Sequence, residues 1–172
     1  MLKKFLAALL LFAASHAPLA FAEDTTPCPK GLICASAPQS VADAMMVAGY
    51  RAKMSTDDLG DPKISSAAAG YDFSIFFYGC KEHVRCDSLQ FNITFTDDGK
   101  NTIALANDWN KKKWFAQMAL LDDKRLEVRY DLATIGGVNQ ANFADVMAWW
   151  ETTLGGLNAY FKEQDAAAKP GS

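Results

Sequence analysis

Histidine is scarce in this chain, and that scarcity excludes several kinds of enzyme. The 172 residues include two histidines, His16 and His83, and the first lies in a leader-like segment at residues 1–22. A catalytic zinc ion usually takes two or three histidine ligands. A Ser-His-Asp triad needs a placed nucleophile, and the sequence has no Gly-x-Ser-x-Gly turn to supply one. We therefore interpret His83 as a solvated loop residue.

Phosphate-binding and calcium-binding motifs are absent as well. Gly136 and Gly137 follow an expected strand, but no lysine and serine complete a P-loop. Asp57, Asp58 and Asp61 share one turn, which lacks the alternating acidic ligands and final glutamate of an EF-hand. The sequence therefore predicts no catalytic residue, no metal site and no cofactor.

Positive charge is also in short supply. The chain has 17 Lys and Arg residues against 20 Asp and Glu residues, a formal net charge of −3. Lys3 and Lys4 are the charged residues of segment 1–22, so the net charge without that segment is about −5. Because nucleic-acid binding depends on Lys and Arg residues that neutralise phosphates, we expect no nucleic-acid partner.

No apolar run in the sequence is long enough to cross a bilayer. The run at residues 5–12 is much shorter than the ~20 residues that span a membrane as a helix. A basic start precedes it, and Ala20-Phe21-Ala22 follows with the small residues that a signal peptidase accepts. We predict a signal peptide cleaved after Ala22, a periplasmic or secreted protein, and no membrane anchor after cleavage.

Four cysteines remain after this cleavage, which is an even number. In an oxidising compartment, an even set indicates disulfides, and local pairing is the simplest of three connectivities. We predict the bridges Cys28–Cys34 and Cys80–Cys86. Both spacings exceed the gaps usual in structural zinc sites and the Cys-x-x-Cys turn of thiol–disulfide oxidoreductases.

Hydrophobic periodicity predicts a mixed domain after an irregular arm at residues 23–37. Helical spacing predicts helices over residues 36–49, 103–120 and, after an N-cap at Asn139, up to about residue 161. Period-two alternation and turn residues predict strands over residues 50–55, 63–66, 71–80, 88–96 and 126–132. This order, α-β-β-β-β-α-β-α, indicates an α+β fold with helices packed on one face of an antiparallel sheet. Residues 163–172 are expected to form a disordered tail.

The strands at residues 71–80 and 88–96 form the clearest hairpin. If Cys80 lies directly opposite Cys86, each apolar residue of one strand meets an apolar residue of the other. The predicted pairs are Phe77/Leu89, Ile75/Phe91, Phe73/Ile93 and Tyr71/Phe95. A slip of one residue would place apolar side chains opposite polar ones. The disulfide and the hydrophobic pattern therefore indicate the same register.

Several aromatic side chains lie off the predicted apolar faces. The last helix has an apolar stripe formed by Phe143, Met147, Trp150, Leu154, Leu157 and Phe161. Trp149 and Tyr160 lie beside this stripe, Trp114 lies off the stripe of the middle helix, and Phe76 and Tyr78 lie on the polar side of the hairpin. Such residues are either peripheral core or a binding surface, because aromatic residues are enriched at interface hot spots. We take these five as the candidate binding residues.

A series of short motifs extends from about Pro38 to Phe161. They are Ala48-Gly49-Tyr50-Arg51-Ala52, Gly60-Asp61-Pro62-Lys63-Ile64, Phe77-Tyr78-Gly79-Cys80, Cys86 to Phe91, Trp109-Asn110, Phe115 and Asp131 to Gly137. On these motifs the chain resembles the YbjN domain family, as an exported branch that contains cysteines, with its domain at residues 38–162. The resemblance implies a fold similar to type III secretion chaperones and a role described as sensory-transduction regulation.

The sequence leads to two hypotheses about function. The first is an exported, non-enzymatic binding or regulatory domain, chaperone-like toward an envelope protein or peptide, with homodimerisation left open. The alternative is an envelope enzyme or a thiol–disulfide redox protein that uses Cys80 and Cys86. A deep pocket that gathers titratable groups would favour the enzyme, whereas an exposed aromatic patch would favour binding.

Overall fold

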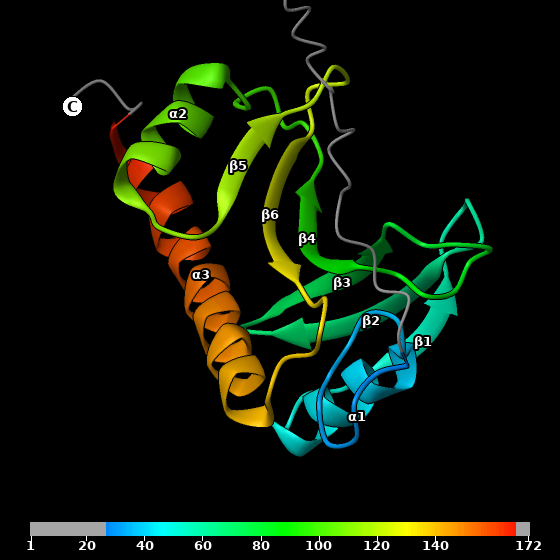
Figure 1. The fold of residues 1–172 in the computed structure, drawn as a ribbon. Coiled ribbons are helices and arrows are strands. Elements are labelled where there is room, and N and C mark those ends of the chain that lie inside the picture. The colour runs from blue at the N-terminus through cyan, green and yellow to red at the C-terminus, as the bar shows by residue number, and fades with distance from the viewer. Residues whose placement is uncertain (1–26, 168–172) are drawn as a thin grey trace, which may run out of the picture.

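A six-stranded antiparallel sheet is the frame of the structure, a computed structural model that describes residues 27–167 (Figure 1). The strands are β1 (Lys53–Thr56), β2 (Pro62–Ala68), β3 (Tyr71–Tyr78), β4 (Ser88–Phe95), β5 (Gln117–Leu120) and β6 (Leu126–Ala133), arranged in the order β1-β2-β3-β4-β6-β5. The helices are α1 (Pro38–Val47), α2 (Ile103–Lys112) and α3 (Gln140–Ala167). The predicted α+β class is confirmed. The predicted signal peptide lies outside the described residues.

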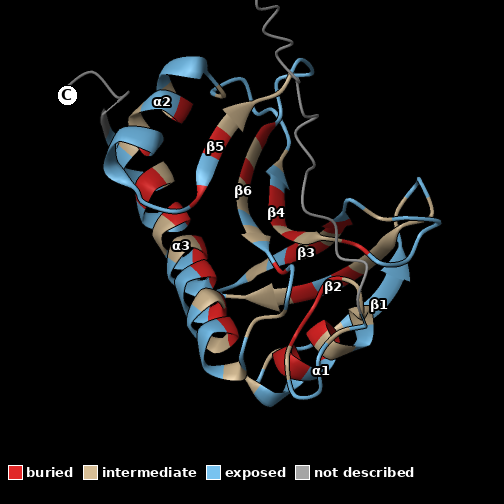
Figure 2. Cartoon of the chain, viewed as in Figure 1, coloured by how far each residue is buried: buried red, intermediate tan, exposed pale blue. Residues whose placement is uncertain are grey.

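The core lies between one face of the sheet and helices α1 and α3 (Figure 2). Along β3 the residues alternate, so that Phe73, Ile75 and Phe77 are buried while the residues between them are more exposed. The ring of Trp150 on α3 lies 5.8 Å from the Phe73 ring and 5.7 Å from the Phe91 ring. Because the buried residues share one face, the other face of the sheet is left to solvent, as is common for antiparallel sheets.

The β3–β4 hairpin has the predicted register. Phe77 pairs with Leu89, and Ile75 pairs with Phe91. At the far end of the hairpin, the Tyr71 and Phe95 rings meet edge-on at 5.7 Å. Disulfides join Cys80 to Cys86 and Cys28 to Cys34, which is the predicted pairing.

The middle helix predicted over residues 103–120 is wrong in its second half. Helix α2 ends at Lys112, and β5 pairs with β6 so that Met118 faces Val128. The Asn110 side chain accepts a hydrogen bond from the Met118 amide at 2.8 Å and donates one to the Met118 carbonyl at 2.9 Å. Residues 117–120 form a strand because they pair with β6, although their spacing also fits a helix. Asn110 then provides hydrogen-bond partners for the backbone of Met118 at the outer edge of β5.

The structure differs from the predicted boundaries in smaller ways after α1 and at the end of α3. The predicted strand at residues 50–55 begins later, at Lys53, because the Tyr50 amide donates to the Met45 carbonyl and so closes α1. Gly49 has a φ of +90° in this closing turn, a conformation that glycine adopts readily. The predicted N-cap of α3 is present, since Asn139 accepts a hydrogen bond from the Asn142 amide at 2.8 Å. Residues 163–167, expected in the tail, continue α3.

None of the described helices is both long and apolar enough to cross a membrane.

Candidate functional site

The structure divides the five candidate aromatic residues among three places. Trp114 and Trp149 lie near each other, beside the turn that joins α2 to β5. Phe76 and Tyr78 lie on the solvent face of the sheet. Tyr160 lies in the core. The candidate residues therefore do not form one continuous surface.

The prediction that Tyr160 contributes to a binding surface is wrong. Its side chain is only 2% exposed, and its ring lies 5.2 Å from the Trp109 ring. The Tyr160 hydroxyl donates a hydrogen bond to the Leu105 carbonyl at 2.7 Å and lies 3.2 Å from the Asp108 carboxylate. The apolar stripe of α3 marks the side of the helix that packs against the sheet, whereas α2 covers a second side. The sequence pattern of α3 does not reveal this contact with a distant segment.

Because the Tyr160 hydroxyl is buried, we predict that the protein loses stability at alkaline pH. Burial, and then the hydrogen bond to Asp108, raise the pKa of Tyr160 from 10.0 to about 12. Because the folded pKa is the higher one, the contribution of Tyr160 to stability is complete below pH 10 and is lost as the pH rises through about 12. We expect the free energy of unfolding, measured with urea, to fall across this window, and to fall less steeply in the Tyr160→Phe variant. Part of the decrease in the free energy of unfolding should remain in this variant, because burial and Glu151 raise the pKa of Tyr50 to about 12 as well. An identical slope in the variant would mean that the hydroxyl is not buried as described.

Three exposed aromatic side chains form what we call the aromatic patch: Trp114, Phe115 and Trp149. They are 79%, 58% and 44% exposed. The Phe115 ring lies 5.1 Å from the Trp149 ring and 6.3 Å from the Tyr130 ring on β6. Because Trp114 and Phe115 are adjacent in the α2–β5 turn and Trp149 lies on α3, the tertiary structure brings the patch together. Exposed apolar clusters of this kind are typical of interaction sites.

Buried contacts on either side of the α2–β5 turn hold the patch in place. Trp109 is fully buried and donates its indole N–H to the Ala116 carbonyl at 3.2 Å. Phe115 has a φ of +67°, which is uncommon for a residue with a side chain and costs about 1–3 kcal/mol. Such a conformation persists only where the surroundings determine it, and such positions cluster at functional sites. Phe115 was missed as a candidate because the sequence pattern placed it inside a helix.

A hollow with a volume of about 300 Å³ lies beside the patch. Trp114 and Trp149 form part of its wall, and Gly156 of α3 contributes no side chain to it. Lys113 also lines the hollow, and its ammonium group lies 5.6 Å from the centre of the Trp109 ring. The hollow is therefore lined by aromatic rings and positive charge.

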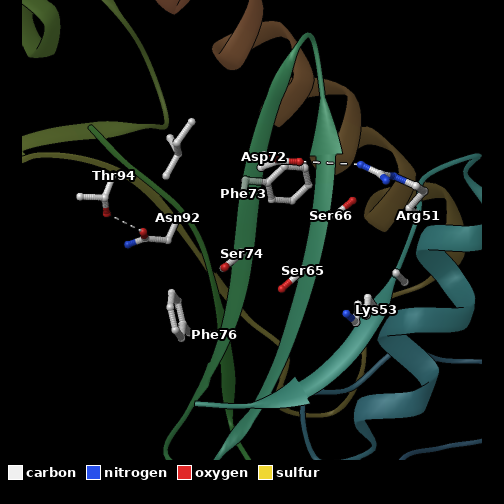
Figure 3. A pocket seen from close by; sticks show the side chains of 12 residues that line it. Arg51, Lys53, Ser65, Ser66, Asp72, Phe73, Ser74, Phe76, Asn92 and Thr94 are labelled. Carbon is white, nitrogen blue, oxygen red and sulfur yellow. Dashed lines mark hydrogen bonds and ion pairs between the residues drawn. The ribbon is translucent and has the colours of Figure 1, made fainter. Parts of the chain in front are cut away.

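The solvent face of the sheet differs from the patch in its chemistry. A shallow hollow of about 520 Å³ lies over β1 to β4, where Arg51 and Asp72 form an ion pair at 3.8 Å (Figure 3). Phe76 lies in this hollow, with the Lys63 ammonium 5.0 Å above its ring. This hollow therefore differs from the aromatic patch because it carries charges of both signs and a lysine lies over the Phe76 ring.

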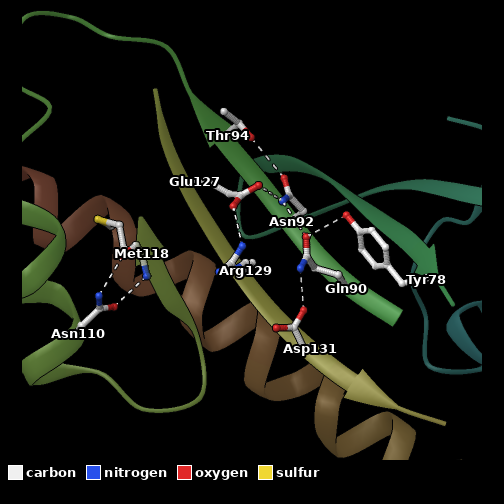
Figure 4. A network of polar contacts seen from close by, with 9 residues as sticks. All are labelled: Tyr78, Gln90, Asn92, Thr94, Asn110, Met118, Glu127, Arg129 and Asp131. Carbon is white, nitrogen blue, oxygen red and sulfur yellow. Dashed lines mark hydrogen bonds and ion pairs between the residues drawn. The ribbon is translucent and has the colours of Figure 1, made fainter. Parts of the chain in front are cut away.

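Several polar side chains of β4 and β6 form hydrogen bonds with one another (Figure 4). Gln90 donates a hydrogen bond to Asp131 at 2.7 Å, and Asn92 donates one to Glu127 at 2.7 Å. The Tyr78 hydroxyl lies 3.5 Å from the Gln90 side chain, and burial followed by nearby carboxylates raises its pKa. Gln90 and Asn92 therefore have little capacity left for a ligand, whereas the buried Nε atom of Arg129 on β6 has no hydrogen-bond partner among residues 27–167.

His83 lies in the loop closed by Cys80 and Cys86. Its Nδ1 atom lies 2.8 Å from an Asp61 carboxylate oxygen, and most of its side chain is exposed. The Asp57 carboxylate accepts hydrogen bonds from the Leu59 and Asp61 amides, so it stabilises its own turn. The contact between His83 and Asp61 thus joins the disulfide loop to the β1–β2 turn. Within residues 27–167 no group of three or more His, Cys, Asp and Glu residues could hold a metal ion.

Comparison with known proteins identifies the family. The sequence profile of the YbjN family, described as "Putative bacterial sensory transduction regulator", matches residues 37–163. A solved structure titled "Crystal structure of YbjN, a putative transcription regulator from E. coli" is 16% identical to this chain, with a TM-score of 0.48. The alignment covers 71% of this chain and 91% of that one. No curated protein matches the sequence. The match of the family profile over most of the chain shows that the protein belongs to the YbjN family.

Proposed function

We propose that this chain is an exported, non-enzymatic domain that binds a protein or peptide through the aromatic patch. One observation carries the proposal: Trp114, Phe115 and Trp149 are exposed side by side, although a folded chain usually buries such rings. Tryptophan is among the residues that dominate binding energy at interfaces. The family description as a regulator is consistent with a protein whose function is to bind.

Export is the second part of the proposal. Two disulfides indicate an oxidising environment, because thiols stay reduced in the bacterial cytosol. The features of residues 1–22 support secretion with cleavage before Glu23. Protein purified from the periplasm should therefore have the mass of a chain that begins at Glu23.

The burial of Cys86 argues against the redox alternative. Exchange at a disulfide requires a thiolate to reach one of the two sulfur atoms. Cys86 is fully buried and Cys80 is half-buried, and both flank strands of the central hairpin. This arrangement supports a structural role for the bridge.

The test compares partner capture by variants of the patch with capture by a matched control. Trp114→Ala and Trp149→Ala remove exposed rings, so we expect the fold to persist while partner affinity falls about thirtyfold. Tyr78→Ala is the control, because Tyr78 is 47% exposed and lies on the other face of the sheet. The tagged proteins are cross-linked in the periplasm, purified and analysed by mass spectrometry, and the affinity for the recovered partner is then measured by calorimetry.

Each outcome of this comparison has a distinct meaning. If the control loses the partner and the patch variants keep it, binding occurs on the sheet face around Phe76 and Tyr78. If the only cross-linked partner is a second copy of the chain, the patch is a homodimer interface. If all three variants keep the same partners and affinities, the proposed surface is wrong.

A further inference from the structure

We infer that the hollow beside the aromatic patch takes an apolar side chain of a peptide segment whose flanking residues are acidic. This inference rests on the proposed function, and it names the chemistry of the partner. Three features of the hollow support it: the open space at Gly156, the apolar character of its wall, and the unpaired positive charge at its rim.

The wall of the hollow includes a glycine that the fold does not require. Gly156 lies within helix α3, where glycine lowers stability relative to alanine. A Cβ atom built on Gly156 would have the Lys113 ammonium nitrogen as its nearest neighbour, at 3.9 Å, which is ordinary contact distance. Neither backbone conformation nor close packing therefore demands glycine at this position. Its effect is to leave space in the hollow beside Lys113.

The wall of the hollow offers few hydrogen-bonding groups. Thr152 and Thr153 line it, and both hydroxyls donate to carbonyls one turn earlier in α3, those of Ala148 at 2.8 Å and Trp149 at 2.9 Å. Because these hydroxyls are already used, the threonines and tryptophans present mainly carbon atoms. A branched aliphatic or aromatic side chain suits a hollow of about 300 Å³ with such a wall.

The charge around the hollow is positive, although the chain as a whole is acidic. Two lysines and no carboxylate line it. Of these two, Lys112 is paired with Asp108 at 2.9 Å, whereas Lys113 forms no ion pair with any residue of the described range 27–167. A partner with Asp or Glu residues beside its apolar anchor would complement the Lys113 ammonium group and would be steered toward it.

A peptide fits these features better than a membrane surface does. Insertion into a bilayer needs aromatic rings that project outward, flanked by basic residues. Here the Phe115 and Trp149 rings pack against each other, and the two lysines line a concavity. The overall negative charge of the chain also opposes binding to anionic lipid.

Random peptides displayed on phage, selected on the immobilised full mature chain, test the inference directly. We expect the enriched peptides to carry Leu, Met or Phe with Asp or Glu on either side. A synthetic copy of the most enriched peptide is then measured by fluorescence anisotropy against variants whose folding is checked by melting temperature. Gly156→Leu fills the hollow, and Lys113→Glu reverses the unpaired charge at its rim. Each should weaken binding by about tenfold or more. Asn158→Leu, an exposed substitution on the same helix, should leave binding unchanged.

The outcomes separate this inference from the proposed function. If partner capture needs Trp114 but is unaffected by Gly156→Leu and by the lysine variant, the inference is wrong while the proposed function stands. Enriched peptides without acidic residues would also overturn the inference. If no peptide is enriched and phosphatidylglycerol vesicles bind in a Trp114-dependent way, the patch is a membrane site and both proposals fail. If Trp114→Ala changes neither capture nor peptide binding, the proposed function fails.

Discussion

Replacing Trp150 by alanine is expected to lower the free energy of unfolding by about 3–5 kcal/mol, the usual range for removal of a buried tryptophan. Trp150 is almost fully buried, and its ring packs against Phe73 on β3 and Phe91 on β4. The substitution therefore opens a cavity where α3 meets the middle of the sheet. Urea unfolding followed by circular dichroism measures the loss.

The neighbouring tryptophan on the same helix is the matched control. Trp149 is exposed, and its ring contacts Phe115 outside the core. Its replacement by alanine should cost less than about 1 kcal/mol, as most surface substitutions do. A larger loss for Trp149→Ala than for Trp150→Ala would contradict the orientation of α3. It would also remove the basis for assigning Trp149 to a binding surface.

Loss of both disulfides is the second large effect that we expect. Each bridge closes a short loop, with a sequence separation of 6. The entropy that such a loop removes from the unfolded chain corresponds to about 2 kcal/mol for each bridge. Reduction of the native protein should thus lower the free energy of unfolding by about 4 kcal/mol in total, measured with urea with and without dithiothreitol.

Separate double variants divide this effect between the bridges. Cys80→Ala with Cys86→Ala opens the loop between β3 and β4, where Glu82, His83 and Arg85 all have positive φ. Without the bridge this loop should relax, and the contact between His83 and Asp61 should be lost from nuclear magnetic resonance spectra. Cys28→Ala with Cys34→Ala should leave that contact in place. If reductant changes the stability of neither the native protein nor the variants, the bridges are absent in solution and the argument for export is weakened.

The sequence determined those parts of the structure in which a short-range pattern has one solution. The β3–β4 register followed from period-two alternation and from the position of Cys80 opposite Cys86, because a shift by one residue would expose one apolar face. The N-cap at Asn139 followed from local hydrogen-bonding chemistry. The positions of Trp114 and Trp149 off the apolar stripes left peripheral core and exposed surface both open, and the structure exposes both side chains.

Only the tertiary structure decided the features that depend on contacts between distant segments. Residues 117–120 have a spacing that also fits a helix, and they form a strand because β6 pairs with them. Tyr160 lies off the α3 stripe, yet α2 buries it. Phe115 becomes part of the patch because the chain turns after Lys112 and brings its ring to Trp149. A local pattern specifies which face of a helix or strand is apolar, but it does not specify which other element packs against the remaining faces. The packing of those other elements brings the residues of the candidate site together.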